Sequence, residues 1–205
     1  MWPLGDYERL VSEIKRRENM NIPVTFGILI ADYRQVKCRE YILNYINRFN
    51  YKSDRYINFY LPGYLEEDIS RKRKDKIRIH EKEYYFDEEI YMRFLYKLES
   101  DFEIDYPYNP VLLLLEYDRG NFKKSKRIVI ELDKDGADIK LVGELFERIF
   151  SYATSSSSIN NISNKLMKTE ITDGLLDSII AAIDNSYLTA IYDKANNIAK
   201  YKLKK

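Results

Sequence analysis

Residues 24–64 constrain the fold of this chain more than any other stretch, because two strand patterns and one helix pattern follow one another there with only turns between them. The segment 24–31 is apolar on both faces, which is typical of a central strand covered by helices. Apolar residues then recur at helical spacing through 38–49, and a second strand pattern at 56–61 ends at the turn dipeptide Pro62-Gly63. This order predicts an α/β domain with two adjacent parallel strands.

A third buried strand is predicted at 111–115, an unbroken run of apolar residues. The alternating segment 127–132 predicts a strand nearer the edge of the sheet, joined to the third strand by a hairpin with its turn at 118–121. We therefore expect a three-layer α/β sandwich with a mostly parallel central sheet.

Two further segments follow the predicted α/β domain, which spans 1–153. Residues 154–164 are rich in Ser and Asn and indicate a linker. Apolar stripes at helical spacing dominate 165–205 and predict a C-terminal helical extension, either a hairpin or one bent helix. The expected organisation is thus one α/β domain, a linker and a helical tail.

Composition limits the partners that this chain can bind. Its 33 acidic and 34 basic residues nearly cancel, so no overall field attracts nucleic acid, and we interpret the mixed charges around the basic run 71–78 as an exposed loop. The longest apolar run is much shorter than the roughly 20 residues of a membrane-spanning helix. No signal-peptide core follows Met1, and the single cysteine, Cys38, agrees with a reducing compartment. We expect a cytoplasmic protein without a membrane partner.

The sequence contains no pattern specific for a metal or a cofactor. His80 is the only histidine, which excludes a histidine-rich zinc site. Gly27 has no second glycine at the spacing of a dinucleotide-binding loop, so a nicotinamide cofactor has no support. We predict neither a metal nor a cofactor.

Candidate ligand-binding residues follow the predicted strands, because ligands of open α/β sheets bind beyond the carboxyl ends of parallel strands. Asp32 follows the first strand, Tyr64 follows the second, and Glu116 and Asp118 follow the third. If these strands are parallel and adjacent, the four side chains meet at one rim, where they could grip a ribose or a base. In the alternative interpretation, Asp32 caps a helix and Asp118 starts a turn.

Two candidate catalytic residues, Glu88 and Glu89, open a predicted helix that Asp87 would cap. A carboxylate held there in a cleft could act as a nucleophile or a general base. The attraction between acidic side chains and a helix N-terminus would also account for both residues.

The order strand, helix, strand across 26–62, with Asp32 after the first strand and Glu88 or Glu89 on a later helix, resembles the Rossmann-like layout of TIR domains and nucleoside deoxyribosyltransferase-like proteins. Those families cleave N-glycosidic bonds with a catalytic glutamate on a helix beside the sheet, and relatives occur in bacterial anti-phage defence systems. The resemblance covers 23–153 and implies that Glu89 or Glu88 carries the catalytic role.

Two functional hypotheses of different classes follow. The first is a nucleotide- or nucleoside-handling domain, N-glycosidase-like, in a bacterial defence system. The second is a non-catalytic interaction or assembly module, in which the C-terminal helices bind another copy of the chain or a partner protein. The residues alone leave open whether the protein is an enzyme.

Overall fold

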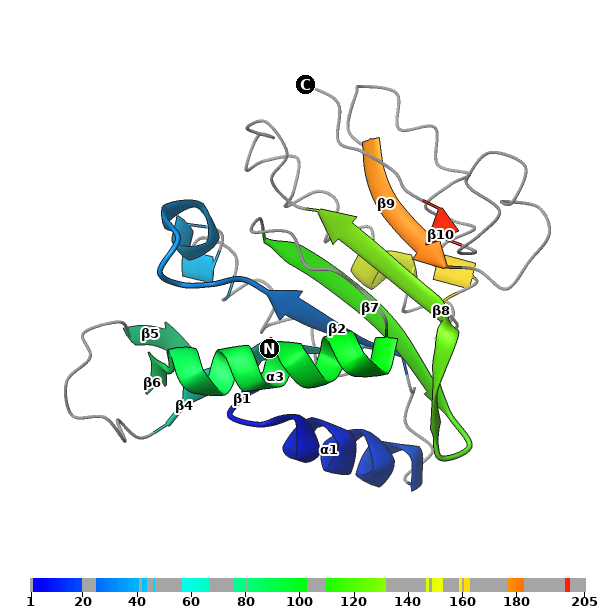
Figure 1. Ribbon diagram of the computed structural model, residues 1–205, viewed down its shortest axis with the longest axis horizontal. Coiled ribbons are helices and arrows are strands. Elements are labelled where there is room, and N and C mark those ends of the chain that lie inside the picture. Colours follow the sequence, from blue (N-terminus) through cyan, green and yellow to red (C-terminus); the bar gives the residue numbers. More distant parts are fainter. Residues whose placement is uncertain are drawn as a thin grey trace.

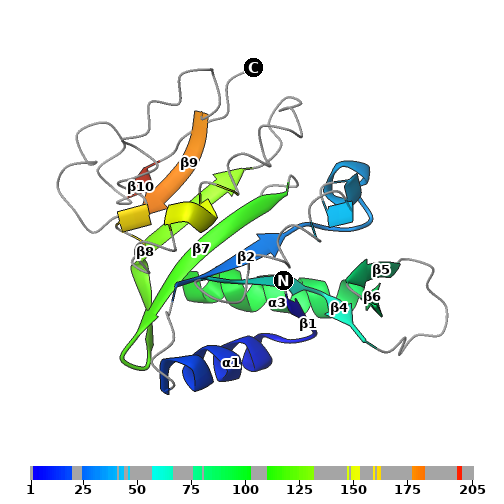
Figure 2. The ribbon, with the colours of Figure 1, turned by 180° about the vertical axis from the view of Figure 1, so that it is seen from behind.

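Figure 1 shows a computed structural model of the protein, and Figure 2 shows the same fold from behind. The structure describes residues 2–19, 25–40, 42–43, 46, 57–66, 76–79, 81–102, 110–131, 147, 149–152, 159, 161–162, 177–182 and 198–199.

Two sheets form within these residues. The larger sheet has seven strands in the spatial order β1 (Trp2–Leu4), β3 (Asn58–Pro62), β2 (Thr25–Ile30), β7 (Val111–Asp118), β8 (Asn121–Glu131), β9 (Asp177–Ala182) and β10 (Ile198–Ala199). The smaller sheet has three strands in the order β4 (Tyr64–Leu65), β6 (Lys82–Phe86) and β5 (Lys76–Ile79).

The two strands predicted from the first stretch of the chain are confirmed. Every residue of β2 and of β3 is buried, and the two strands pair in parallel, with Gly27 opposite Phe59. Strand β1 adds to the far side of β3, also in parallel. The sequence therefore identified the parallel part of the sheet.

The prediction of a mostly parallel sheet is wrong. Strand β7 runs antiparallel to β2, with Thr25 opposite Glu116 and Ile30 opposite Val111, and β8, β9 and β10 each run antiparallel to the strand before them in the sheet. A continuous apolar run shows that a strand is buried on both faces, but it carries no information about direction. Direction depends on the end of the sheet at which the chain enters the strand, and β7 begins beside the last residue of β2.

The hairpin predicted between the third and fourth strands is confirmed. Asp118 pairs with Asn121, and the two residues between them, Arg119 and Gly120, both have positive φ angles, as a tight two-residue hairpin turn requires. The register of β7 and β8 shifts between Leu115 and Tyr117.

The predicted helical tail is wrong over the part that the structure describes. Residues Asp177–Ala182 form β9, which pairs antiparallel with β8, and Ile198–Ala199 form β10 beside it. A short run rich in Ile fits a strand as well as a helix, and the edge of β8 supplies backbone partners that stabilise the strand. The rest of the predicted linker and tail lies outside the described residues, at 154–158, 160, 163–176, 183–197 and 200–205.

Helices α1 (Tyr7–Asn19) and α3 (Glu88–Phe102) lie side by side on one face of the larger sheet (Figure 1). The Tyr7 hydroxyl donates a hydrogen bond of 2.6 Å to Asp101, and the Tyr7 ring packs edge-on against Phe94. The opposite face carries the helical residues 149–152, where Phe150 packs on Phe59 (Figure 2). No helix among the described residues is long and apolar enough to cross a membrane.

The cap predicted at Asp87 is confirmed, and Asp6 caps α1 in the same way. The Asp6 carboxylate accepts a hydrogen bond of 2.6 Å from the backbone N–H of Arg9, and the Asp87 carboxylate accepts one of 3.1 Å from Ile90. Each cap fixes where its helix starts.

Gly63 joins the two sheets. Its N–H donates to the carbonyl of Leu4 at 2.9 Å, and its carbonyl accepts from the N–H of Asp87 at 2.8 Å. Its φ angle of 83° lies in the left-handed region that favours glycine. This residue therefore connects β1 to the start of α3.

Candidate functional site

The structure brings together two of the predicted site residues, Asp32 and Glu88, through Arg34. The Arg34 guanidinium donates to both oxygens of Asp32, with Nε to Oδ1 at 2.9 Å and Nη2 to Oδ2 at 2.5 Å, and it also forms an ion pair with Glu88. Hydrogen bonding to Asp32 raises the pKa of Arg34, and Glu88 adds to the effect. Both carboxylates are thus engaged by the same cation.

Asp32 also holds the turn after β2. Its Oδ1 accepts a hydrogen bond of 3.0 Å from the backbone N–H of Arg34, two residues on, which is an Asx turn. The helical residues begin only at position 36, so Asp32 supports the turn and does not cap the helix directly. This role is close to the alternative that the sequence left open.

Tyr64 belongs to the core and does not line a rim. It is 1% exposed, and its ring packs edge-on against Tyr33 and beside Phe86, with ring centroids 6.2 and 5.3 Å away. Burial raises the pKa of its hydroxyl well above the usual value, so the phenol is neutral at pH 7. A buried, neutral side chain of this kind supports packing and cannot grip a ligand at the surface.

The remaining predicted residues lie apart from this cluster. Glu116 sits opposite Thr25, five residues along β7 from Val111, which places it about 17 Å from the end of β2. Its carboxylate accepts a hydrogen bond of 3.1 Å from the backbone N–H of Ile159. Asp118 pairs with Lys123 at the hairpin. The expected rim does not form, because β7 runs antiparallel and carries both residues to the opposite end of the sheet.

Glu89 is exposed on α3, next to the ion-paired Glu88. Acidic residues at this helix N-terminus are stabilised by the helix dipole, as the alternative interpretation held. The catalytic role proposed for Glu88 and Glu89 stays a prediction.

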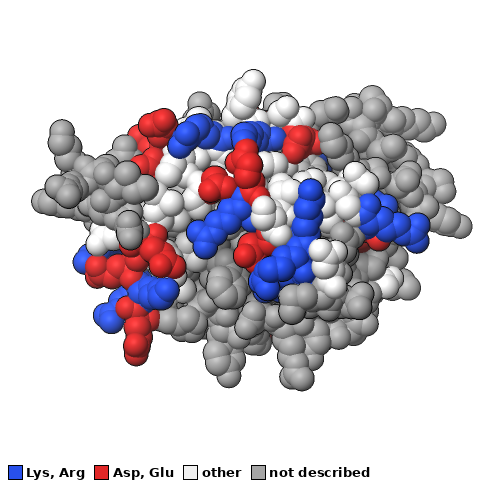
Figure 3. Space-filling view, turned by 90° about the horizontal axis from the view of Figure 1, so that it is seen from below, with Lys and Arg blue, Asp and Glu red and all other residues white. Residues whose placement is uncertain are grey.

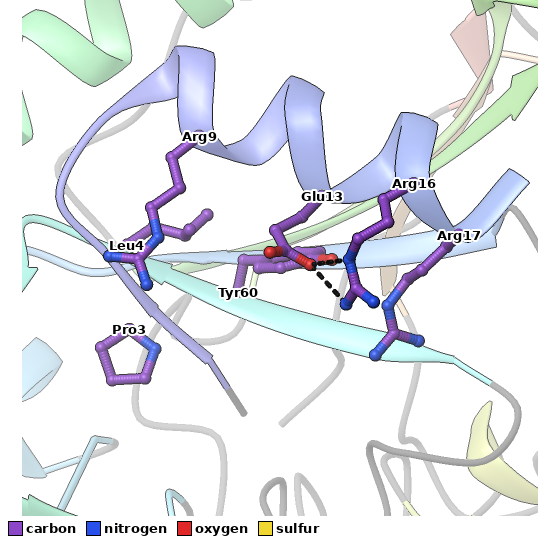
Figure 4. A pocket seen from close by; sticks show the side chains of 7 residues that line it. All are labelled: Pro3, Leu4, Arg9, Glu13, Arg16, Arg17 and Tyr60. Atoms are coloured by element: carbon purple, nitrogen blue, oxygen red, sulfur yellow. Dashed lines mark hydrogen bonds and ion pairs between the residues drawn. The ribbon is translucent and has the colours of Figure 1, made fainter. Parts of the chain in front are cut away.

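A pocket of about 130 Å³ lies elsewhere, between α1, the edge strand β1 and its neighbour β3 (Figure 4). We call it the arginine pocket, and it is lined by Pro3, Leu4, Arg9, Glu13, Arg16, Arg17 and Tyr60.

The spacing of charged residues on α1 builds one wall of this pocket. Residues Arg9, Glu13 and Arg16 follow one another at four- and three-residue intervals, so they share one face of the helix. Leu10 and Ile14 share a neighbouring face and are buried against the sheet. Burial of this apolar stripe rotates the charged face over β3, where Figure 4 shows it above the pocket.

The lining of the arginine pocket is positively charged overall. Three arginines face one carboxylate, Glu13, whose Oε2 pairs with Nη2 of Arg16 at 2.9 Å. The side chains of Arg16 and Glu13 are 59% and 39% exposed, so this ion pair is solvated and can exchange partners at low cost. An anion entering the pocket would meet the solvated guanidinium of Arg16.

Tyr60 forms the floor of the pocket. It is 2% exposed, and its ring packs edge-on against Phe26. Burial raises the pKa of the Tyr60 hydroxyl, while the nearby Arg17 acts in the opposite direction. The floor is therefore a neutral phenol at pH 7, and its ring is too buried to stack against a ligand.

This pocket was not predicted from the sequence, because arginines on one side of an amphipathic helix are typical of a solvated face. The helical spacing of Arg9, Glu13 and Arg16 was a signal, but only the packing of α1 shows which strand lies below them. Figure 3, which looks at the molecule from below, shows basic and acidic side chains interleaved over this face. The positive charge is local to the pocket, in agreement with the near-zero net charge.

Within the part of the chain that the structure describes, no group of three or more His, Cys, Asp or Glu residues could hold a metal ion. Comparisons of the chain with protein-family models, with curated proteins and with solved structures found no match. The geometry of the arginine pocket therefore carries the functional argument.

Proposed function

We propose that this protein binds a nucleotide in the arginine pocket. One observation carries the proposal: three guanidinium groups, from Arg9, Arg16 and Arg17, line a single pocket with a partly apolar floor. Each guanidinium is a planar fork of N–H donors that matches phosphate oxygens in a bidentate fashion. A phosphate is thus the anion that this lining recognises best.

Features beside the arginines favour a nucleotide over inorganic phosphate. Pro3 offers an apolar contact to a base, and the planar guanidinium of an exposed arginine can stack on one. Glu13 offers a carboxylate that can accept hydrogen bonds from ribose hydroxyls, as acidic residues do in dinucleotide sites.

Cleavage of an N-glycosidic bond is not part of this proposal. Glu88 is paired with Arg34, and neither Glu88 nor Glu89 lines the arginine pocket. The assembly hypothesis stays a prediction, since most of the segment on which it depends lies outside the described residues.

Calorimetric titration of the full chain with adenosine and uridine 5′-monophosphates tests the proposal. Replacing Arg16 by Gln should weaken binding about tenfold, because a charge-assisted hydrogen bond to phosphate contributes about 1.5–3 kcal/mol. Lys15→Gln is the matched control: it removes the same charge from the next residue of α1, which is exposed and does not line the pocket. Equal weakening by both substitutions would show a diffuse charge effect and refute the pocket as the binding site.

A further inference from the structure

A second pocket, of about 130 Å³, lies between helices α1 and α3, which run side by side in Figure 1. We call it the interhelical pocket, and it shares no lining residue with the arginine pocket. Its lining is both charged and apolar. The charged side chains are Asp6 and Glu8 at the start of α1 and Arg93 and Lys97 on α3, and the apolar ones include Ile90 and Phe94.

Only two of the four charged side chains in the interhelical pocket are paired. Glu8 and Lys97 form an ion pair between the two helices, so their charges largely cancel. Asp6 and Arg93 form no ion pair with each other or with any other residue that the structure describes. One carboxylate and one guanidinium therefore line the same small pocket and remain apart.

Both of these groups can still bind a ligand. The Asp6 carboxylate accepts the backbone N–H of Arg9 through Oδ1, which leaves its second oxygen as an acceptor. Arg93 is exposed, and its planar guanidinium carries N–H donors in a fork that fits a carboxylate. A ligand with an ammonium group for Asp6 and a carboxylate for Arg93 would pair both charges at once.

The size of the interhelical pocket restricts such a ligand to a few atoms. A cavity of about 150 Å³ holds one molecule of benzene, so the 130 Å³ of this pocket suits a ligand of that size or slightly smaller. Alanine has the same number of non-hydrogen atoms as benzene, whereas phenylalanine has twice as many. Ile90 and Phe94 supply an apolar surface for a small side chain such as a methyl group.

We propose that the interhelical pocket binds a small free α-amino acid, such as alanine, with its carboxylate at Arg93 and its ammonium group at Asp6. The pairing of two opposite charges that lie apart in one small pocket carries this proposal. The site is separate from the arginine pocket, and the binding of an amino acid does not depend on the binding of a nucleotide.

Nuclear magnetic resonance titration of the full chain with L-alanine and two probes of the same size tests the proposal. L-Alanine amide keeps the ammonium group and replaces the carboxylate by a neutral amide, and L-lactate keeps the carboxylate and replaces the ammonium group by a hydroxyl. Each probe loses one charge-assisted interaction, so both should bind about tenfold or more weakly than alanine. L-Phenylalanine should also bind more weakly than alanine, because its ring exceeds the space available.

Two substitutions assign the two charges. Asp6→Asn removes the negative charge and keeps a residue that caps a helix equally well, so it should weaken alanine binding about tenfold without weakening lactate binding. Arg93→Gln should weaken alanine binding about tenfold without weakening the binding of alanine amide. Arg78→Gln is the matched control, because it removes the same group from an exposed position of β5 that does not line the pocket.

Several results would overturn the proposal. They are the absence of alanine binding up to about 10 mM, an affinity for alanine amide or lactate equal to that for alanine, and equal weakening by Arg93→Gln and Arg78→Gln. Tight binding of phenylalanine would contradict the size of the site. Because the probes are compared on the unmodified chain, the proposal can be overturned even where a variant does not fold. None of these results bears on the nucleotide proposed for the arginine pocket.

Discussion

Replacement of Gly63 by Ala tests the junction that connects the two sheets. A Cβ at this position would lie 2.7 Å from the Cβ of Tyr91 and 3.1 Å from Cε2 of Phe86. The Cβ of Tyr91 belongs to the rigid part of α3 and cannot turn away, so the helix itself would have to shift. Overpacking of this kind costs about 1–3 kcal/mol, and the left-handed φ angle of 83° adds about 1–2 kcal/mol for a residue with a side chain. We expect the free energy of unfolding to fall by about 2–5 kcal/mol.

Gly120→Ala is the matched control for this prediction. Gly120 has a φ angle of 79°, close to that of Gly63, but a Cβ there has no atom within 4 Å. Only the backbone cost of about 1–2 kcal/mol applies, so the difference between the two variants isolates the packing contribution of about 1–3 kcal/mol.

Urea unfolding of the unmodified chain and of both variants, followed by far-ultraviolet circular dichroism, measures this difference. The midpoint for Gly63→Ala should be clearly lower than that for Gly120→Ala, with unchanged slopes. Equal midpoints would show that Tyr91 does not pack against Gly63, and would refute the placement of α3 on the junction.

Two further predictions concern pH and the residues selected from the sequence. Burial raises the pKa of the Tyr64 and Tyr91 hydroxyls above the value near 10 that is expected for the unfolded chain. The free energy of unfolding should therefore fall only as the pH rises above about 10. The expected fall is roughly 1.4 kcal/mol per pH unit for each tyrosine that stays protonated in the folded protein. Urea midpoints that do not change between about pH 8 and pH 11 would contradict this burial. Glu88→Gln should lower the free energy of unfolding by less than about 1 kcal/mol, because the side chains of Glu88 and Arg34 in this ion pair are both more than 40% exposed. The same substitution should leave the affinity for nucleotides unchanged. A loss of nucleotide affinity in this variant, measured by calorimetry, would contradict binding in the arginine pocket and place the binding site at the residues predicted from the sequence.

The elements that could be predicted are those whose signals are local. The buried pattern of β2, the cap at Asp87 and the turn at Arg119 and Gly120 each depend on residues only a few positions apart. Each of these predictions is confirmed by burial, by a hydrogen bond or by a φ angle. Contacts between sequence neighbours form in whatever fold surrounds them, and a single sequence is enough to recognise them.

The predictions that failed depended on long-range pairing. The apolar run of β7 is the same whether the strand runs parallel or antiparallel, yet its direction decides whether Glu116 lies near Asp32 or at the opposite end of the sheet. The segment Asp177–Ala182 could have formed a helix, but the edge of β8 supplies a pairing partner 50 residues away. The predicted ligand-binding rim does not form because one strand, β7, runs antiparallel to β2.

The sequence by itself determined that this chain has a buried parallel pair, where its helices and its hairpin begin, and that α1 has a charged face. Only the tertiary structure decided what that face covers. The arginine pocket forms because burial of Leu10 and Ile14 rotates Arg9, Glu13 and Arg16 over Tyr60, a residue more than 40 positions away. Helical spacing records which side chains share a face, whereas the surface that the face meets depends on packing between distant segments, which no local pattern contains.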